Sequence, residues 1–195
     1  MTLLTAVLLA ALRAADVYTY WIEPCTRAET RCRKEDEALA EWAIRAWEGA
    51  SGGAIVMQTT KDQAKARIRL YWVGARSGLY GEARSIVFEG KRGAEVYVRP
   101  DLSQLGPAID AAGRADPLFR DTVVYLTCLH ETGHALGLPH TAAYDDIMYS
   151  FQFGGDITEY FGRYRRKLSA RDDIRRHPGI SPDDRDSLIA RHAAR

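Results

Sequence analysis

The chain has 195 residues, and its 27 Lys and Arg residues against 26 Asp and Glu residues leave a formal net charge of +1. This length is enough to bury one full hydrophobic core but short for two ordinary enzyme domains, so we expect a single domain over residues 16–195. The near-neutral charge gives no electrostatic reason to expect nucleic acid or an acidic membrane surface as the main partner.

The start of the chain contains a ten-residue apolar run, residues 3–12, which is followed by Arg13. This pattern is typical of the hydrophobic part of a secretory signal, and the run is too short to span a bilayer. No basic residue precedes the run and no clean cleavage site follows it, so a buried first strand or helix is the alternative. A signal peptide over residues 1–15 would make the protein secreted or periplasmic.

The next part of the chain predicts strands with one helix among them. Aromatic and β-branched residues with a period of two indicate strands, and apolar residues at helical spacing before Ser51 indicate an amphipathic helix. The expected strands are residues 17–22, 54–59, 67–73, 79–88 and 94–98, and the expected helix is residues 34–50. Residues 89–93 are expected to form a turn. This order predicts an α/β (α+β) fold in which a five-stranded mixed sheet carries a helix on its face.

The three cysteines fall into two groups. Cys25 and Cys32 are seven residues apart in a polar, Arg-rich connection, where a small disulfide loop would form in an exported protein. Two unpaired thiols would also fit this separation. Cys128 lies on an apolar stretch and is expected to be a buried free thiol that packs as a small hydrophobic side chain.

The second half of the chain predicts further helices. Residues 102–115 are ambiguous, and residues 118–136 form a strongly apolar helix with Asp121 as the candidate N-cap and Gly137 as the stop signal. A last helix over residues 181–192 opens with the sequence SPDD, which provides a cap and acidic first-turn residues. Residues 163–176 carry seven basic residues interrupted by two aspartates, and a solvated face is favoured there over a binding patch.

The motif that indicates chemistry is residues 130–140, which read HETGHALGLPH. His130 and His134 are four residues apart on a helix, so they project from the same face and can hold one metal ion. Gly137 can adopt the left-handed conformation that breaks the helix, which lets His140 supply a third nitrogen ligand. Three protein ligands leave one coordination position open, which is typical of a catalytic zinc rather than a structural one.

Glu131 follows the first histidine directly and is expected to be the catalytic base rather than a ligand. In this interpretation it accepts a proton from the water that attacks a scissile carbonyl, and it then passes that proton to the leaving amine. The predicted reaction is peptide-bond hydrolysis without a covalent intermediate.

This motif and the residues that follow it resemble the metzincins, because H-E-x-x-H-x-x-G-x-x-H is followed by the sequence DIMY, in which Met148 stands eight residues after His140. That spacing is similar to the matrixin branch, which includes the catalytic domains of matrix metalloproteinases. The resemblance implies a zinc-dependent metalloendopeptidase with a twisted mixed sheet, an N-terminal helix, an active-site helix and a C-terminal helix. It also implies that Met148 forms an apolar floor beneath the zinc-binding imidazoles.

The resemblance suggests further site residues. In such enzymes the strand that matches residues 79–83 is the sheet edge beside the cleft, so Tyr80, Gly81 and Glu82 are candidates for substrate contact. An edge strand without a substrate role is an equally weighted alternative. Asp183 and Asp184 match an acidic pair of which one supports the methionine turn, although helix capping also explains them. Tyr149 directly follows the methionine, so we do not assign it as a zinc ligand.

Several features depart from the family pattern. Only two of the five histidines remain outside the motif, so a second, structural zinc site of the usual form is not expected, and one catalytic Zn²⁺ is the predicted cofactor. No calcium-site motif is recognisable, which leaves calcium unsupported by the sequence. No cysteine-containing propeptide is recognisable, so latency through a thiolate on zinc is not expected. Residues 149–180 are longer than the equivalent matrixin connection, which leaves the substrate preference open.

Two other functions remain as alternatives. One is a processing peptidase of narrow specificity, or an exopeptidase, in which residues 149–180 close the cleft. The other is a catalytically silent, metal-containing binding module that recruits a partner through residues 163–176, although the retained Glu131 argues against it. The favoured interpretation is a monomer that acts on polypeptide substrates, with no nucleic-acid partner and no stable membrane anchor.

Overall fold

The computed structural model describes residues 14–74 and 80–193. The predicted signal peptide therefore lies outside the described residues, apart from Ala14 and Ala15. Within the described ranges, no helix is both long and apolar enough to cross a membrane.

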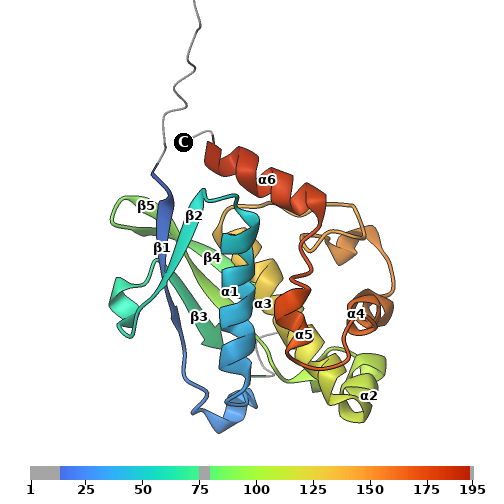
Figure 1. The fold of residues 1–195 in the computed structure, drawn as a ribbon. Helices are drawn as coiled ribbons and strands as arrows, with labels where there is room; N and C mark the ends of the chain where they lie inside the picture. Colours follow the sequence, from blue (N-terminus) through green and yellow to red (C-terminus); the bar gives the residue numbers. More distant parts are fainter. Residues whose placement is uncertain (1–13, 75–79, 194–195) are drawn as a thin grey trace, which may run out of the picture.

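Five strands form one sheet in the order β2-β1-β3-β5-β4 (Figure 1). The strands are β1 (Asp16–Ile22), β2 (Ile55–Thr59), β3 (Ile68–Trp72), β4 (Gly81–Phe88) and β5 (Lys91–Val98). All neighbouring pairs are parallel except β4 and β5, which are antiparallel. The mixed five-stranded sheet expected from the sequence is thus present, and β4 forms the edge of the sheet opposite β2.

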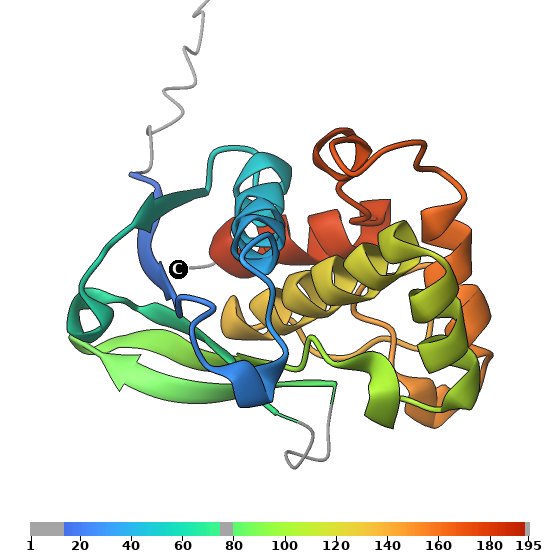
Figure 2. The ribbon, with the colours of Figure 1, turned by 90° about the horizontal axis from the view of Figure 1, so that it is seen from below.

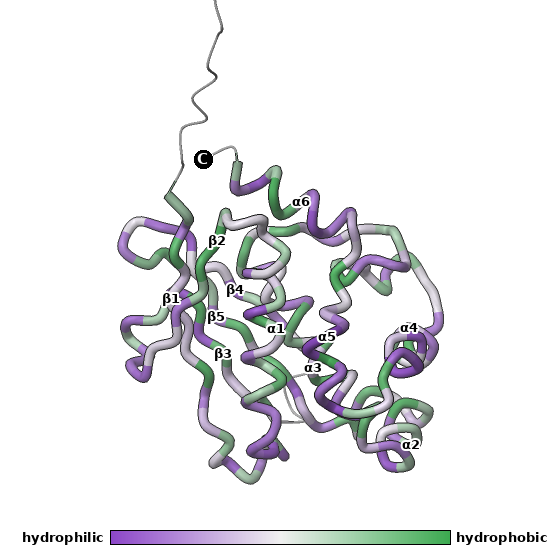
Figure 3. The backbone as a smooth tube through the Cα atoms, viewed as in Figure 1, coloured by the Kyte–Doolittle hydropathy of each residue, from purple (hydrophilic) through white to green (hydrophobic). Residues whose placement is uncertain are grey.

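Helices α1 (Asp36–Ala50) and α3 (Pro117–Ala135) lie on the same face of this sheet (Figure 2). Alternate residues of β3, namely Ile68, Leu70 and Trp72, are almost completely buried. The backbone coloured by hydropathy shows apolar stretches in the strands and polar turns between them (Figure 3). Trp47 of α1 donates an indole hydrogen bond of 2.8 Å to the carbonyl oxygen of Leu129, which links the two helices inside the core.

The connection between β4 and β5 is shorter than the sequence suggested. Phe88 pairs with Lys91, so Glu89 and Gly90 alone form the turn, and both have positive φ angles of 48° and 73°. Such two-residue turns match the right-handed twist of a hairpin. The expected five-residue turn over residues 89–93 was wrong because the basic residues after Gly90 continue the strand.

The start of α3 also differs from the prediction. Asp116 is the N-cap, since its side chain accepts a hydrogen bond from the backbone N–H of Leu118, and Pro117 occupies the first helical turn. Asp121 lies inside the helix, where it forms ion pairs with Arg120 and Arg171. The ambiguous residues 102–115 contain a short 3₁₀ turn, η4 (Leu102–Gln104), and helix α2 (Pro107–Ala115).

The long connection after the methionine is ordered into short helices. It contains η5 (Phe151–Phe153), α4 (Ile157–Arg165) and α5 (Asp173–Arg176), and α6 (Pro182–Ala193) follows it. Of the seven basic residues in 163–176, five form ion pairs with carboxylates, namely Arg163, Arg165, Arg166, Arg171 and Arg176. Most of this positive charge is therefore neutralised locally.

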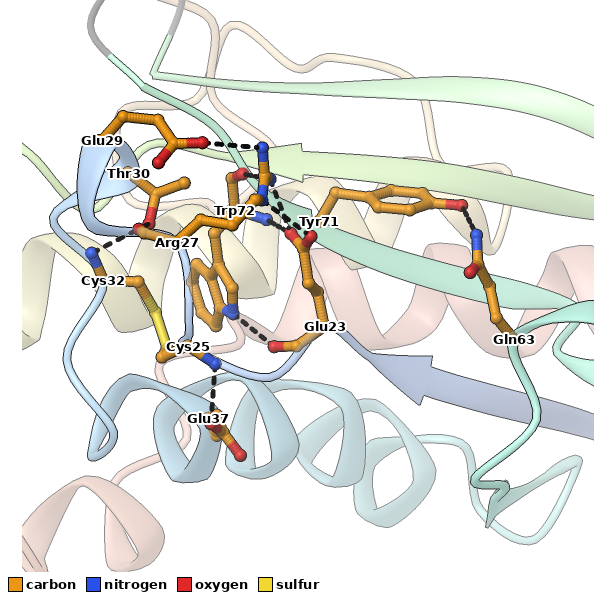
Figure 4. Close-up of polar contacts among 10 residues, drawn as sticks. All are labelled: Glu23, Cys25, Arg27, Glu29, Thr30, Cys32, Glu37, Gln63, Tyr71 and Trp72. Atoms are coloured by element: carbon orange, nitrogen blue, oxygen red, sulfur yellow. Dashed lines mark hydrogen bonds and ion pairs between the residues drawn. A yellow bond between two sulfur atoms is a disulfide. The ribbon is translucent and has the colours of Figure 1, made fainter.

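A disulfide joins Cys25 and Cys32 around the 3₁₀ turn η1 (Ala28–Thr30) (Figure 4). The loop is attached to the end of β3, because Arg27 donates a hydrogen bond of 2.6 Å to the carbonyl oxygen of Trp72. The backbone N–H of Cys25 donates to the carboxylate of Glu37 in α1. The third cysteine, Cys128, is a buried free thiol, as expected.

Candidate active site

Helix α3 ends in a turn that brings the third histidine of the motif back toward the first two. Gly137 has a φ of 96°, and the backbone N–H groups of Gly137 and Leu138 donate to the carbonyl oxygens of His134 and Gly133. This pattern is a Schellman motif, which needs a residue in the left-handed conformation just after the helix. The local sequence therefore reverses the chain and places His140 opposite the helix.

The Nε2 atoms of the three histidines converge on one point. The Nε2 atom of His140 lies 3.2 Å from that of His130 and 3.0 Å from that of His134. Tetrahedral zinc with Zn–N bonds of 2.0–2.1 Å holds its nitrogen ligands about 3.3 Å apart. The spacing therefore fits a zinc ion, and no other described group of three His, Cys, Asp or Glu residues offers such a cluster.

Two carbonyl groups fix the orientation of the helix-borne histidines. The Nδ1 atoms of His130 and His134 lie 2.6 Å and 2.8 Å from the carbonyl oxygens of Ile147 and Leu138. Because a carbonyl only accepts hydrogen bonds, each Nδ1 must carry the proton, and each Nε2 then presents its lone pair to the shared point. A hydrogen bond from the ring nitrogen that does not face the metal is typical of metal-binding histidines.

The surroundings of the histidines favour neutral imidazoles. Burial lowers the pKa of His130 to about 3, and the charge of His134 contributes in the same direction. Burial also lowers the pKa of His134. Since a histidine must be deprotonated at the coordinating nitrogen to bind a metal, this environment suits metal binding at neutral pH.

Glu131 lies beside the histidine cluster and is only 7% exposed. Burial raises the pKa of this carboxyl group to about 8, and the negative charge of Glu82 adds to the effect. A divalent cation held by the three imidazoles would favour the carboxylate and reverse this shift. The carboxylate packs against the start of β4, because a Cβ atom added at Gly81 would lie 2.6 Å from the Cγ atom of Glu131.

The methionine turn lies directly beneath α3. A Cβ atom added at Gly133 would lie 2.3 Å from the sulfur of Met148, so only glycine at this position allows Met148 to approach the helix. Asp184 at the start of α6 accepts hydrogen bonds of 2.7 Å and 3.3 Å from the backbone N–H groups of Ile147 and Met148. Asp184 also exchanges hydrogen bonds with Ser181, so it both caps α6 and supports the turn.

An apolar pocket of about 270 Å³ opens beside the histidine cluster. Two of the three candidate edge-strand residues, Tyr80 and Gly81, line it together with His130, Glu131 and His140. The third, Glu82, instead forms an ion pair of 2.8 Å with Arg84 and does not line the pocket. The structure therefore brings the start of β4, but not the side chain of Glu82, to the cluster.

Sequence reasoning missed most of the pocket wall. The missed lining residues come from α3, the methionine turn, η5 and α4, namely Leu126, Thr127, Ile147, Tyr149, Ser150, Phe151, Ile157, Tyr160 and Phe161. A weak signal was present, since Ile157, Tyr160, Phe161 and Tyr164 recur at helical spacing among charged residues.

The structure combines a mixed sheet with a helix that carries two histidines and a glutamate. A third histidine follows a glycine turn, and a buried methionine lies beneath the three histidines. Together these features define a metzincin-type catalytic domain. The family model described as matrixin matches residues 14–159, which is most of the chain. The chain belongs to the matrixin family, and this membership suggests a zinc metallopeptidase. No curated protein matches the chain.

Proposed function

We propose that the protein is a zinc-dependent metalloendopeptidase that hydrolyses peptide bonds in extended polypeptides. The observation that carries this proposal is the convergence of three Nε2 atoms next to a buried glutamate, at the mouth of a pocket lined by the edge strand. His130, His134 and His140 would hold the ion. When bound, zinc supplies Lewis acidity that polarises a carbonyl group and acidifies water.

The residues around the ion would transfer one proton from the attacking water to the leaving amine. The carboxylate of Glu131 accepts the proton of the attacking water and delivers it to the nitrogen of the leaving amine. Gly81 fixes the position of this carboxylate, because the backbone of β4 packs directly against it. Nδ1–H donation to the Ile147 and Leu138 carbonyl groups keeps the imidazole rings of His130 and His134 in place throughout.

The edge strand β4 supplies the surface on which an extended substrate would lie. One side of β4 pairs with β5, and its other side has no strand partner among the described residues. A peptide can add to such an edge through backbone hydrogen bonds. Tyr80 and Gly81 lie nearest the histidine cluster, so we assign substrate contact to the backbone there. Any contribution of Glu82 would also come from its backbone.

The pocket favours an apolar substrate side chain next to the cut. The hydroxyl groups of Tyr80, Tyr149 and Tyr160 donate to the carbonyl oxygens of Leu105, Gly154 and Asp146. These three tyrosines therefore present mainly ring carbon to the pocket. A volume of about 270 Å³ suits one amino-acid side chain rather than a larger ligand.

We also propose that the protein works outside the cytoplasm as a monomer, on polypeptides and without a membrane anchor. The Cys25–Cys32 disulfide supports this location, because disulfides persist mainly in oxidising compartments.

The test combines zinc analysis with one substitution. The native protein and Glu131→Gln are each expected to bind one zinc per chain. The native protein should cleave an unfolded protein until a chelator is added, whereas Glu131→Gln should lose about 10²-fold or more in kcat. Cleavage by Glu131→Gln at the native rate would exclude Glu131 as the base. Folded protein without zinc affinity would overturn the assignment of the histidines and the function with it.

A processing peptidase of narrow specificity is the second candidate, and the position of α4 favours it. The ring of Phe161 in α4 lies 6.4 Å from that of Tyr80, the residue just before the edge strand β4, so α4 narrows the cleft. Cleavage that depends strongly on peptide length would support this candidate, and indifference to length would support the general endopeptidase. A silent binding module is expected to bind zinc and cut no member of a broad peptide library.

A further inference from the structure

The disulfide loop, residues 25–32, holds a backbone conformation that an open chain would disfavour. Inside the loop, the hydroxyl group of Thr30 donates a hydrogen bond to the carbonyl oxygen of Arg27. The 3₁₀ turn η1 ends at Arg31, whose φ of 53° lies in the left-handed region. Residues with a Cβ atom adopt this region only at an energetic cost. The conformation of Arg31 therefore depends on closure of the loop.

One side of the disulfide loop is attached to the end of β3. Arg27 donates to the carbonyl oxygen of Trp72 and pairs through two hydrogen bonds with Glu23 (Figure 4). The carboxylate of Glu23 also accepts a hydrogen bond of 2.9 Å from the backbone N–H of Trp72. A Cβ atom added at Gly74 would lie 2.9 Å from the carbonyl oxygen of Glu29, so the chain that leaves β3 runs directly against the loop.

The other side of the disulfide loop is connected to the residue just before the edge strand. Arg31 forms an ion pair of 3.3 Å with Asp101, whose carboxylate also accepts the backbone N–H of Ser103 in η4. Leu105 follows η4 directly and accepts a hydrogen bond of 3.2 Å from the hydroxyl group of Tyr80. Tyr80 lines the pocket beside the histidines. Polar contacts therefore link the loop to the start of β4.

The disulfide itself is within reach of a reductant. Cys25 and Cys32 are both partly exposed, whereas Cys128 is completely buried. Exposed disulfides are more easily reduced than buried ones. A dithiol would supply two electrons and two protons, so that the S–S bond breaks, Cys25 and Cys32 become thiols and the dithiol becomes a disulfide.

We infer that the redox state of Cys25 and Cys32 controls how tightly the protein binds an extended polypeptide. The oxidised loop holds Tyr80 and the start of β4 in place. In the reduced loop Arg31 is free to leave the left-handed conformation, and with it the contact to Asp101, so the start of the edge strand becomes less ordered. This inference deepens the proposed peptidase function and rests on it for the identity of the substrate.

The zinc site should not respond to reduction. The Nδ1 atoms of His130 and His134 face the carbonyl oxygens of Ile147 and Leu138, which lie outside the disulfide loop. Loss of stability alone also makes a different prediction. Unfolded molecules do not turn over, so they would lower the apparent kcat and leave the KM of the folded molecules unchanged. A rise in KM at constant kcat therefore separates weaker substrate binding from partial unfolding.

The experiment measures steady-state cleavage of a peptide by the zinc-loaded native protein before and after reduction by a phosphine, which has no thiol to compete for zinc. Reduction should raise KM about threefold to tenfold and leave kcat within about twofold. Cys25→Ser/Cys32→Ser should show the raised KM without the reductant and should not respond to it. An unchanged KM in both reduced native protein and the double variant would overturn the inference, as would an equal response of the double variant.

A second variant keeps the disulfide and removes one contact. Arg31→Ala should raise KM about twofold, because exposed ion pairs are weak, and reduction should then raise KM by less than in the native protein. Arg33→Ala is the matched control, since Arg33 is exposed and, among the described residues, makes contacts only through its backbone. A native KM and a native response to reduction in Arg31→Ala would contradict the inference.

An NMR measurement without substrate separates this inference from the proposed function. The backbone N–H of Arg99 donates a hydrogen bond of 2.8 Å to the carbonyl oxygen of Tyr80, so its amide signal should shift on reduction. The amide signal of Leu138, which donates to Gly133 at the end of α3, should stay in place. If the native protein cuts no polypeptide, the peptidase proposal fails while the Arg99 signal still decides the role of the loop. An unchanged Arg99 signal would reject that role.

Discussion

At the scale of single residues, three glycines determine where the reactive groups of this site lie. Gly81 admits the carboxylate of Glu131, Gly133 admits the sulfur of Met148, and the positive φ of Gly137 reverses the chain toward His140. A Cβ atom at Gly81 or Gly133 would come within 2.6 Å or 2.3 Å of its neighbour. The positions of the reactive groups thus depend on the absence of a side chain at these glycines as well as on the side chains that are present.

Gly81→Ala should displace the Glu131 carboxylate. The added methyl group would lie 2.6 Å from Cγ and 2.7 Å from Oε1 of Glu131, so the side chain has to move away from the reacting water. We expect kcat to fall about tenfold to hundredfold, because misplacement of a catalytic group by about 1 Å is that costly, while zinc stoichiometry stays at one. Steady-state kinetics with zinc analysis tests this.

The matched control for this substitution is Gly49→Ala. A Cβ atom at Gly49 meets nothing within 4 Å, so the activity should be unchanged. Replacement of glycine inside α1 should raise the free energy of unfolding by about 1 kcal/mol. A native kcat for Gly81→Ala would show that the approach of β4 to Glu131 does not position the base.

At the residue scale, the sequence was sufficient to predict the site residues whose positions depend on local spacing. The histidines and Glu131 follow from helical periodicity and a glycine stop, which act within eleven residues. The prediction of Asp121 as the N-cap was wrong because the apolar pattern hides where the first turn begins, whereas Pro117 marks it. The pocket wall was missed because Leu126 and Tyr160 meet only through tertiary packing.

At the scale of elements, the disulfide loop supports two segments that reach the site. Arg27 binds the carbonyl oxygen of Trp72 at the end of β3, and Arg31 forms an ion pair with Asp101 before η4 (Figure 4 shows the first contact). Leu105, which follows η4, accepts the hydrogen bond of the Tyr80 hydroxyl group. The loop thereby steadies the approach to the edge strand.

Replacement of both Cys25 and Cys32 by serine should lower stability. The disulfide closes a loop with a sequence separation of 7, for which the chain-entropy model gives about 2 to 3 kcal/mol in the free energy of unfolding. Urea denaturation of the native and double-serine proteins measures this difference. Treatment with a dithiol should destabilise the native protein and leave the variant unaffected; equal responses would contradict the prediction.

Asp173 makes the stability of the α5 region sensitive to acid. A hydrogen bond from Arg176, with others from the backbone N–H groups of Ala170 and Ser169, lowers the pKa of Asp173 from 3.8 to about 2. Because the folded pKa is the lower one, this carboxylate stabilises the fold above pH 3.8, and the contribution is lost as the pH falls toward 2.

Asp173→Asn should therefore reduce Tm at pH 7 and flatten the decline of Tm between pH 4 and pH 2. Asp172→Asn is the control, since the neighbouring side chain makes no capping hydrogen bond to α5. Thermal unfolding across this pH range measures both variants. Parallel curves for native protein and Asp173→Asn would show that Asp173 does not contribute in this way.

Elements with an uninterrupted periodic pattern were predictable, and elements whose pattern is interrupted by charged residues were not. Strands β1 to β3 and helices α1 and α3 were expected within two residues of their observed bounds, because alternation or helical spacing persists along them. Helices α4 and α5 were missed because charged residues interrupt a pattern of only nine and four residues. Ion pairs stabilise both helices, α4 packs against α3 and α5 packs against α1, and a local pattern contains none of these contacts.

At the scale of the whole molecule, the zinc site joins segments that are distant in sequence. The histidines come from α3 and the turn after it, the floor from Met148, and its support from Asp184 of α6. The order of the strands could likewise not be predicted from the sequence, because β1 lies between β2 and β3 through contacts that no local pattern specifies. A ligand that binds this assembly should stabilise the fold as a whole.

Removal of zinc should lower Tm by about 10 °C. Zinc at a thousand times its Kd stabilises the folded state by about 4 kcal/mol, and each kcal/mol corresponds to about 2–4 °C for a chain of this size. Differential scanning calorimetry with a chelator, and after zinc is restored, measures the shift. Glu131→Gln should show the full shift because Glu131 is not a ligand, and His140→Ala should show a smaller one. The same Tm with and without zinc would contradict the predicted zinc site.

The contact between Asp184 and the methionine turn also sets an order of events during synthesis. The ribosome adds Asp184 44 residues after His140, which takes about 2 to 9 s at common translation rates. For most of this interval a nascent chain already carries all three histidines, Ile147 and Met148, yet the N–H groups of Ile147 and Met148 still lack their carboxylate partner. The floor of the site is therefore completed only after the start of α6 has been made, which delays the mature geometry of the site until then.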